Sequence, residues 1–527
     1  MLRSLRAVIL LALVGLAVAA PAAAHTVPGS PPFRVVIVDH LSTRDLRHLA
    51  VHGAVGLLVP GYGPTTNFRQ ALAELVRGAE VNAHLGGVPS GPRLLSASMV
   101  TGLPSEPRLI VVTMPPKGPP GNNDIRYTIA VLGGGFHGLL VSPTTRIPGL
   151  VSIVDIAPTA LGHARGSLSS IPTDHPVASI HSLNAQIHSN NRLKLAALIV
   201  VACFILLLAF VRPRAATTAV PAALLTNIVL GAAQVTNEVA ILAVLIIGTL
   251  AGALWLARVC RTDDRLLALI VGVVVLHLWL LAAKPEWVAV TPLGPTQVSR
   301  FWGIGNQVET LLLAPLFAGV TISARRFGIA GFTAFALLSL VLMTDNRFGS
   351  DGGGAIVLGV GFAFLGARTL KLGVRGFTLL LLSAAAVVLA IVWFGLRASG
   401  PNHFRSAFGH GVSGLLTVAE NRLPLAYEPA LHNWTLVLPV ALWFVVALAI
   451  AFYWARSRAT RDLLFALALA IVTSLLVNDS AAYELVAGVA VIAGLVRFTP
   501  STEPFRVAAL ARLPLPAQPV ASEATVD

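Results

Sequence analysis

Two patterns of apolar and polar positions divide this chain. From residue 193 onward, apolar runs of 16 to 22 residues recur between short polar connections. A helix of that length crosses a hydrocarbon core of about 30 Å. Before residue 193 the apolar runs are short, β-branched clusters alternate with turns, and Pro and Gly are frequent. The pattern predicts a multi-domain chain in which an α/β domain precedes an all-α polytopic membrane domain.

The long apolar runs predict about eleven membrane helices between residues 193 and 497. Their ranges are 193–211, 215–233, 238–257, 265–283, 308–323, 327–344, 352–368, 376–396, 434–455, 462–477 and 484–496. Composition agrees, because 55% of the residues are apolar and only 11% are charged, against about 25% charged in a soluble protein. A soluble globular enzyme is therefore excluded, and a lipid bilayer is the first expected partner.

The segment before the membrane domain predicts an α/β fold. Strands are expected at 34–38, 109–113 and 129–132, and a helix at 68–77. Four to six apolar residues between turns are typical of buried parallel strands. We expect this domain to span residues 25–163. Residues 164–192 are rich in Ser, His and Asn, which predicts a linker to the membrane.

The first 24 residues have the layout of a secretory signal peptide. Two arginines in the first six residues precede an apolar stretch, and Ala22, Ala23 and Ala24 end it. This order predicts export of the α/β domain, with cleavage after Ala24. The alternative is an uncleaved anchor helix, which would place the domain on the same side.

Positive charge predicts the orientation in the membrane. The 37 basic and 23 acidic residues give a net charge of +14, and basic clusters occupy every second connection between helices. These clusters are Arg212 with Arg214; Arg258, Arg261 and Arg265; Arg325 with Arg326; Arg368, Lys371 and Arg375; and Arg456, Arg458 and Arg461. The positive-inside rule makes these connections cytoplasmic and accounts for the charge without a nucleic-acid partner. We expect a multi-pass plasma-membrane protein with an extracytoplasmic amino-terminal domain and a cytoplasmic tail at 498–527.

Four polar, glycine-containing connections remain for the outer face, at 291–309, 344–354, 397–434 and 478–484. Ionisable groups near a bilayer are costly unless they face water, a cavity or a partner. Asp345, Asp351 and Asp479 are candidate catalytic carboxylates, and Glu484 lies beside them. Candidate substrate-binding residues are Arg300, Asn306, Arg347, His403, Arg405, His410 and His432. The alternative is that these are ordinary solvated loop residues.

Three segments of the α/β domain resemble the alkaline-phosphatase superfamily. They are "FRVVIVDH" (33–40), "GAVGLLVPGYGPTTN" (53–67) and "GLLVSPTTRIPGLVSIVDIAPTALG" (138–162). Through "RFWGIGN", "GSDGGG" and "NDS", the membrane half is similar to bacterial membrane proteins in which such an exported domain precedes many helices.

The resemblance implies a divalent metal pair, with Asp39 as the first ligand and Thr65 or Thr66 as nucleophile. It also implies an Asp-His pair after a later strand, but Met114-Pro115-Pro116 follows the strand predicted at 109–113. Methionine and proline are not ligands for hard metals. We therefore expect a truncated, degenerate domain that retains Asp39 without a metal site, and the sequence indicates no cofactor.

Three classes of function stay open. The first is an envelope enzyme, a transferase or hydrolase acting on a lipid-linked sugar or phosphate, with a carboxylate as base and arginines binding an anionic group. The second is a transporter or flippase, and the third is a non-catalytic assembly or sensing protein with a pseudo-phosphatase domain.

The predicted orientation can be tested with single cysteines and a membrane-impermeant reagent. We expect labelling from outside at Asn306, Gly352 and His410, because the arginine clusters alternate along the chain. Labelling of Gly352 from the cytoplasmic side alone would contradict the orientation and every site inferred from it.

Overall fold

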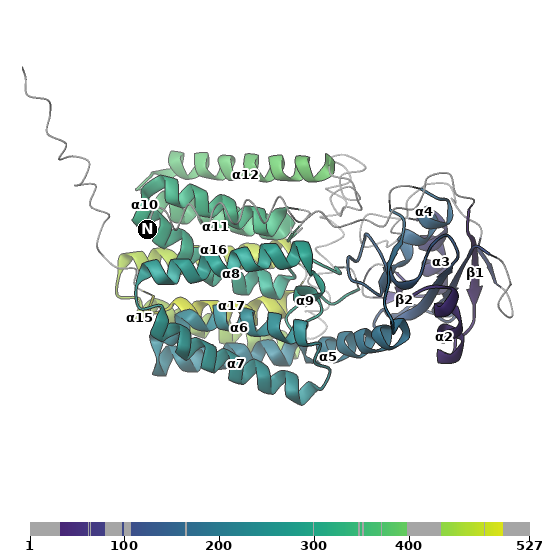
Figure 1. Ribbon diagram of the computed structural model, residues 1–527. Coiled ribbons are helices and arrows are strands. Elements are labelled where there is room, and N and C mark those ends of the chain that lie inside the picture. The colour runs from purple at the N-terminus through teal and green to yellow at the C-terminus, as the bar shows by residue number, and fades with distance from the viewer. Residues whose placement is uncertain are drawn as a thin grey trace, which may run out of the picture.

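The computed structural model describes residues 32–61, 63, 65–78, 97–99, 107–163, 166–298, 300–345, 348–349, 352–369, 371–397, 434–478 and 480–498. The predicted signal peptide and the tail after residue 498 lie outside these ranges. An α/β domain stands at one end of a bundle of long helices (Figure 1).

The α/β domain contains an eight-stranded mixed sheet with the order β10-β8-β2-β7-β5-β1-β4, in which β9 also pairs with β2. The strands are β1 (Arg34–Val38), β2 (Gly53–Val59), β4 (Ala97–Met99), β5 (Leu109–Thr113), β7 (Tyr127–Leu132), β8 (Gly138–Val141), β9 (Leu150–Ser152) and β10 (Ser169–Ile171). Two short strands, β3 (Thr65–Thr66) and β6 (Gly121–Asn122), pair separately.

The expectation of buried parallel strands is confirmed for β1 and β5, which pair in parallel, and was wrong for β7. β7 is antiparallel to both β2 and β5, and β10 is antiparallel to β8. The connection from β5 to β7 contains no helix. Without a helical crossover the chain returns in the opposite direction, because parallel neighbours need a longer connection.

Side chains of the sheet alternate between two cores, as the strand period of two requires. In β1, Val36 and Val38 face the helix α2 (Thr43–His52) and the first part of α5. Val35 and Ile37 face the other side, where α3 (Phe68–Arg77), the 3-10 turn Ile153–Asp155 and α4 (Ile156–Ala160) lie. Both faces of the sheet are covered.

The described part of the predicted linker, residues 166–192, contains a strand and the beginning of a long helix. Residues 169–171 form β10, and one continuous helix, α5 (Pro176–Val211), begins 17 residues before the expected membrane helix at 193. At 1.5 Å per residue its 36 residues span about 54 Å. Val177, Ile180 and Ile187 pack in the α/β core, whereas Leu198 and Ile205 pack in the bundle. The two parts of the molecule thus share a helix.

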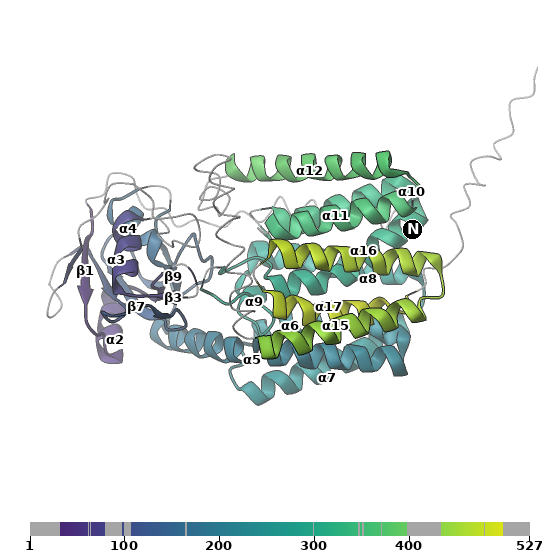
Figure 2. The same cartoon turned by 180° about the vertical axis from the view of Figure 1, so that it is seen from behind.

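The remaining helices form the bundle (Figure 2). They are α6 (Pro213–Ala233), α7 (Glu238–Val259), α8 (Asp263–Ala283), the short α9 (Glu286–Ala289), α10 (Asn306–Thr344), α11 (Gly352–Thr369), α12 (Val374–Arg397), α15 (Trp434–Trp454), α16 (Arg458–Val477) and α17 (Ala481–Leu495). In the part of the chain that the structure describes, eight helices are long and apolar enough to span a membrane, and two shorter apolar helices accompany them. The chain has the architecture of a multi-pass membrane protein.

The segments predicted at 308–323 and 327–344 both lie in α10, which folds back on itself at Gly328. Gly328 has φ 65° and ψ −149°, outside the helical region. The Phe335 ring fills the space beside Gly319, and Gly331 lies against the Ser323 carbonyl. Residues so far apart in sequence would not meet in a straight helix, so α10 is a helical hairpin.

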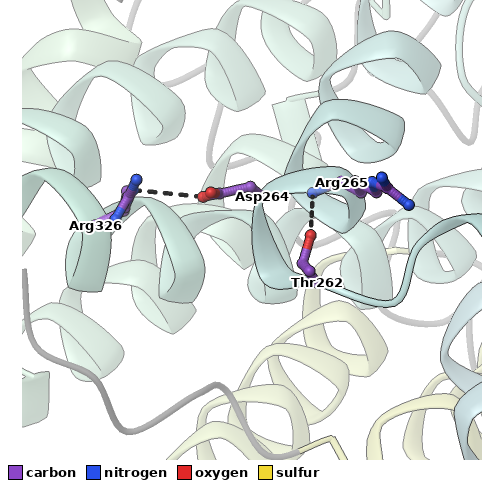
Figure 3. A network of polar contacts seen from close by, with 4 residues as sticks. All are labelled: Thr262, Asp264, Arg265 and Arg326. Atoms are coloured by element: carbon purple, nitrogen blue, oxygen red, sulfur yellow. Dashed lines mark hydrogen bonds and ion pairs between the residues drawn. The ribbon is translucent and has the colours of Figure 1, made fainter. Parts of the chain in front are cut away.

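Basic connections gather at the end of the bundle away from the α/β domain. There Arg326 Nε lies 3.4 Å from Asp264 Oδ1 (Figure 3), and Arg368 Nε lies 2.9 Å from Asp462 Oδ1. Arg497 stacks over Trp454 at 4.8 Å from the ring centroid. Basic and polar connections therefore sort to opposite ends, as the sequence predicted, while the compartment at each end stays a prediction.

Replacing Gly328 should destabilise the α10 hairpin. The Gly328 backbone occupies a region that is nearly exclusive to glycine, so Gly328→Ala should cost about 1–3 kcal/mol. No atom lies within 4 Å of the new methyl group, which leaves backbone strain as the cause. Thermal unfolding of the purified protein measures the loss. Gly373→Ala is the control, since that turn glycine has equal space and no positive φ; equal effects of both variants would contradict the strained turn.

Candidate functional site at the domain interface

The connection between α8 and α10, residues 284–305, lies between the α/β domain and the bundle, and we call it the docking segment. Most of it is irregular backbone, yet Val290, Leu293, Phe301 and Trp302 are at most 4% exposed. Buried carbonyl groups outside helices and strands need donors from elsewhere. The structure supplies them from both sides.

One row of α5 side chains donates to the docking segment. Gln186 Nε2 and Asn190 Nδ2 each donate to the Val290 carbonyl at 3.0 Å, and Lys194 Nζ donates to the Pro295 carbonyl at 3.0 Å. These three residues are spaced by four and therefore share one helix face. All three are buried. The polar composition that predicted a linker instead supplies hydrogen bonds at a buried helix face.

The α/β domain contacts the docking segment through loops at one edge of its sheet. Arg126 Nη2 donates to the Gln297 carbonyl at 2.7 Å, and Gly63 N donates to the Val298 carbonyl at 3.1 Å. Trp302 Nε1 donates to the Thr144 carbonyl at 3.0 Å. These loops adjoin the carboxyl ends of β2 and β8 and the start of β7, which runs the opposite way. This edge of the sheet is covered by the membrane half.

Arg146 connects the two parts electrostatically. Its guanidinium carbon lies 3.5 Å from the centroid of the Trp302 ring. Burial lowers the pKa of Arg146 to about 10, while the nearby Asp345 acts in the opposite direction. Arg146 therefore stays protonated at neutral pH. A cation on an aromatic face with restricted water contributes up to about 2 kcal/mol.

A buried carboxylate fixes the loop that carries Arg146. Asp155 accepts hydrogen bonds from the Ser142 hydroxyl, from Thr144 Oγ1 at 2.7 Å and from Thr144 N at 3.2 Å. Burial raises the pKa of Asp155 to about 6, although these hydrogen bonds favour the charged form. The segment 138–162 thus positions an interface arginine.

Three polar connections of the membrane half converge where the docking segment ends. They are 291–309, which shares residues with the docking segment, 344–354 and 478–484. Ile304 N donates to the Gly349 carbonyl at 3.2 Å, and Asn306 Nδ2 donates to Ser480 Oγ at 3.0 Å. Gly303 has φ 83°, and a Cβ there would lie 2.4 Å from the Gly349 carbonyl oxygen. Only glycine permits this approach. The motifs "RFWGIGN", "GSDGGG" and "NDS" therefore meet at one end of the bundle.

At this convergence a hydrogen-bonded chain joins two buried glutamates, Glu309 of α10 and Glu484 of α17, both 0% exposed. Asn478 Nδ2 donates to the two Glu309 carboxylate oxygens at 3.1 and 3.3 Å and to Ser474 Oγ at 2.9 Å. Ser474 Oγ in turn donates to Glu484 Oε2 at 2.9 Å. We call these four residues the Glu309–Glu484 chain.

Both glutamates lie in the first turn of their helices. The free N–H groups and the positive end of the helix dipole favour a negative charge at that position. The site therefore lies near the end of the bundle rather than midway along the helices.

The structure places only some of the predicted site residues. Asn306 is at the convergence, Asp345 is the electrostatic neighbour of Arg146, and Arg300 Nη1 donates to the Ile304 carbonyl within the docking segment. Asp39 is exposed after β1, whereas Thr66 is 7% exposed in β3. The remaining candidates lie outside the described residues: Asp351, Asp479, Arg347, His403, Arg405, His410 and His432.

The sequence did not indicate Glu309, Ser474, Asn478 or Arg146 as site residues. Glu309 and Asn478 are within the polar connections that it identified, at 291–309 and 478–484. The available signal was the position of Glu309 three residues after "RFWGIGN", at the beginning of an apolar run.

Within the described ranges no group of three or more His, Cys, Asp or Glu side chains is arranged to hold a metal. No protein-family model, curated protein or solved structure matches the chain.

The contact between Arg146 and Trp302 should contribute to the joint stability of the two parts. A double-mutant cycle with Arg146→Gln and Trp302→Leu should give a coupling energy of about 1–2 kcal/mol in thermal unfolding of the whole protein. The control cycle uses Arg108 and Phe33, a pair at 4.4 Å inside the α/β domain. The Arg146 and Trp302 variants should also be cleaved faster by protease between the α/β domain and the bundle, whereas the Arg108 and Phe33 variants should not. Additive effects of Arg146 and Trp302 would contradict this contact.

Proposed function

We propose that this chain is an integral membrane protein of the bacterial cell envelope that acts on a lipid-linked sugar or phosphate at the end of the bundle facing the α/β domain. The observation that carries the proposal is the Glu309–Glu484 chain, buried where three polar connections meet. Buried ionisable groups in membrane helices are costly, and function is the usual reason for their presence.

The charges at this end suit an anionic, hydroxyl-bearing substrate. Glu309 and Glu484 supply carboxylates that could act as a general base, and their link through Asn478 and Ser474 holds them in one geometry. Arg146 is a cation that stays protonated, and it stacks on Trp302 of the docking segment. Arg300 lies on the same segment. A carboxylate acting together with a guanidinium is the combination that deprotonates a hydroxyl while a phosphate is bound.

The position of the glutamates supports head-group chemistry over transport. A transport site is expected near the bilayer midplane, commonly at broken helices, whereas Glu309 and Glu484 occupy first turns. In this proposal the site faces the extracytoplasmic side, because the predicted cytoplasmic clusters occupy the opposite end.

A second candidate is a non-catalytic assembly or sensing protein with a pseudo-phosphatase domain. The loop that contains Gly63, next to Thr65 and Thr66, is held against Val298 of the docking segment. The superfamily resemblance would place the catalytic residues at this edge of the sheet. In this alternative, the same edge binds the docking segment instead.

Neutralising each glutamate tests the proposed site. Glu309→Gln and Glu484→Gln keep the side-chain size, so folding should change little, while loss of a general base lowers turnover by about 10² to 10⁴-fold. Lipid-linked intermediates extracted from cells should accumulate in both variants and in a strain lacking the protein.

Glu238→Gln is the matched control. Glu238 also lies in a helix first turn, but its side chain is 37% exposed and pairs with Arg192 at 3.4 Å. An exposed pair contributes about 0–1 kcal/mol, so this variant should behave as wild type. If lipid-linked intermediates are identical with and without the protein, the enzymatic proposal is wrong. If the Arg146 or Trp302 variants behave like the strain that lacks the protein and the glutamate variants do not, the assembly function is favoured.

A further inference from the structure

An apolar groove lies on the bundle between α5 and α15, over α17, far from the Glu309–Glu484 chain. Its volume is about 90 Å³, and every residue that lines it is apolar. Both α5 and α15 pack against α17. The lining residues come from the carboxyl-terminal ends of α5 and α17 and from the second half of α15, toward the end of the bundle that carries the basic connections.

Small residues form the floor of this groove, and aromatic residues close its end. Ala209, Ala451 and Ala493 are at most 3% exposed, and their short side chains leave the space between the helices open. Phe210 and Trp454 form an edge-to-face pair with centroids 4.7 Å apart at the end of the groove. Tryptophan at a helix end is typical of the boundary between hydrocarbon and head groups.

An arginine lies within two residues of the end of each helix that forms the groove. Arg212 follows α5, Arg456 follows α15 and Arg497 follows α17. All three are exposed. Arg497 also stacks on Trp454, which lines the groove. The apolar groove therefore ends close to the positive charges of these three arginines.

We propose that this groove binds an acyl chain of an anionic phospholipid, whose phosphate contacts Arg212, Arg456 and Arg497. The helices α5 and α15 are membrane-spanning candidates, so the groove opens toward hydrocarbon rather than water. Each arginine near an anionic head group adds favourable electrostatic interaction. The charge complementarity selects an anionic head group over a zwitterionic one.

Native mass spectrometry of the full-length protein, delipidated and then titrated with lipid, tests the proposal. The probes are phosphatidylglycerol and phosphatidylcholine with the same acyl chains. Wild type should bind phosphatidylglycerol more tightly. Arg456→Gln should weaken this binding about fivefold, since one such cation contributes about 1 kcal/mol, and should leave phosphatidylcholine binding unchanged. Arg258→Gln removes an exposed charge at the same end, from α7, which does not line the groove, and should have no effect.

A pair of adjacent valines tests the groove itself. Val446 lines the groove and is 46% exposed, whereas Val445 is 57% exposed and does not line it. Val446→Trp should fill the groove and abolish tight phosphatidylglycerol binding, while Val445→Trp should bind as wild type, with similar thermal unfolding of both variants. Equal affinity of wild type for the two lipids, or equal binding by the two tryptophan variants, would overturn the proposal.

Discussion

The carbonyl groups of the docking segment set the constraint on which the architecture depends. Residues 284–305 are mostly irregular and largely buried, and a buried carbonyl without a donor costs about 1–3 kcal/mol. Donors come from two directions: Gln186, Asn190 and Lys194 of α5, and Arg126 of the α/β domain. Neither part of the molecule could move away without leaving these carbonyls unsatisfied. The docking segment thereby holds the sheet edge, the end of the bundle and the polar connections in one arrangement.

Much of the fold was predictable because long apolar runs have few alternatives to helices in a chain of this composition. The predicted membrane segments lie on helices of the structure, and the strand expected at 109–113 is β5. Predictions were wrong where they were based on composition alone, because composition does not show which residues come into contact in the fold. A run rich in Ser, His and Asn predicts a linker, although Asn190 and Gln186 are buried donors in a long helix. Strand direction likewise depends on the connection from β5 to β7, which apolar runs do not encode.

The candidate site was only partly predictable for a related reason. Sequence identified the polar connections, and the structure brings three of them together through Ile304, Gly349 and the Asn306–Ser480 hydrogen bond. It could not identify Arg146, because a basic residue in a loop of the α/β domain gives no indication that it will stack on Trp302. Burial of Glu309 and Glu484 depends on how α10, α16 and α17 pack together, and the helix dipole favours an acidic residue at a helix start whether or not that residue is buried.

The continuous helix α5 makes the spacing between the two parts a fixed quantity. Each residue of an α-helix adds about 1.5 Å of length and about 100° of rotation. One residue inserted between Ile187 and Leu198 would turn the apolar face that packs in the α/β core away from the face that packs in the bundle. Flexible linkers between domains tolerate changes in length, but here even a single insertion would misalign two cores at once. We therefore expect the length of this stretch of α5 to be among the most restricted features of the chain during evolution.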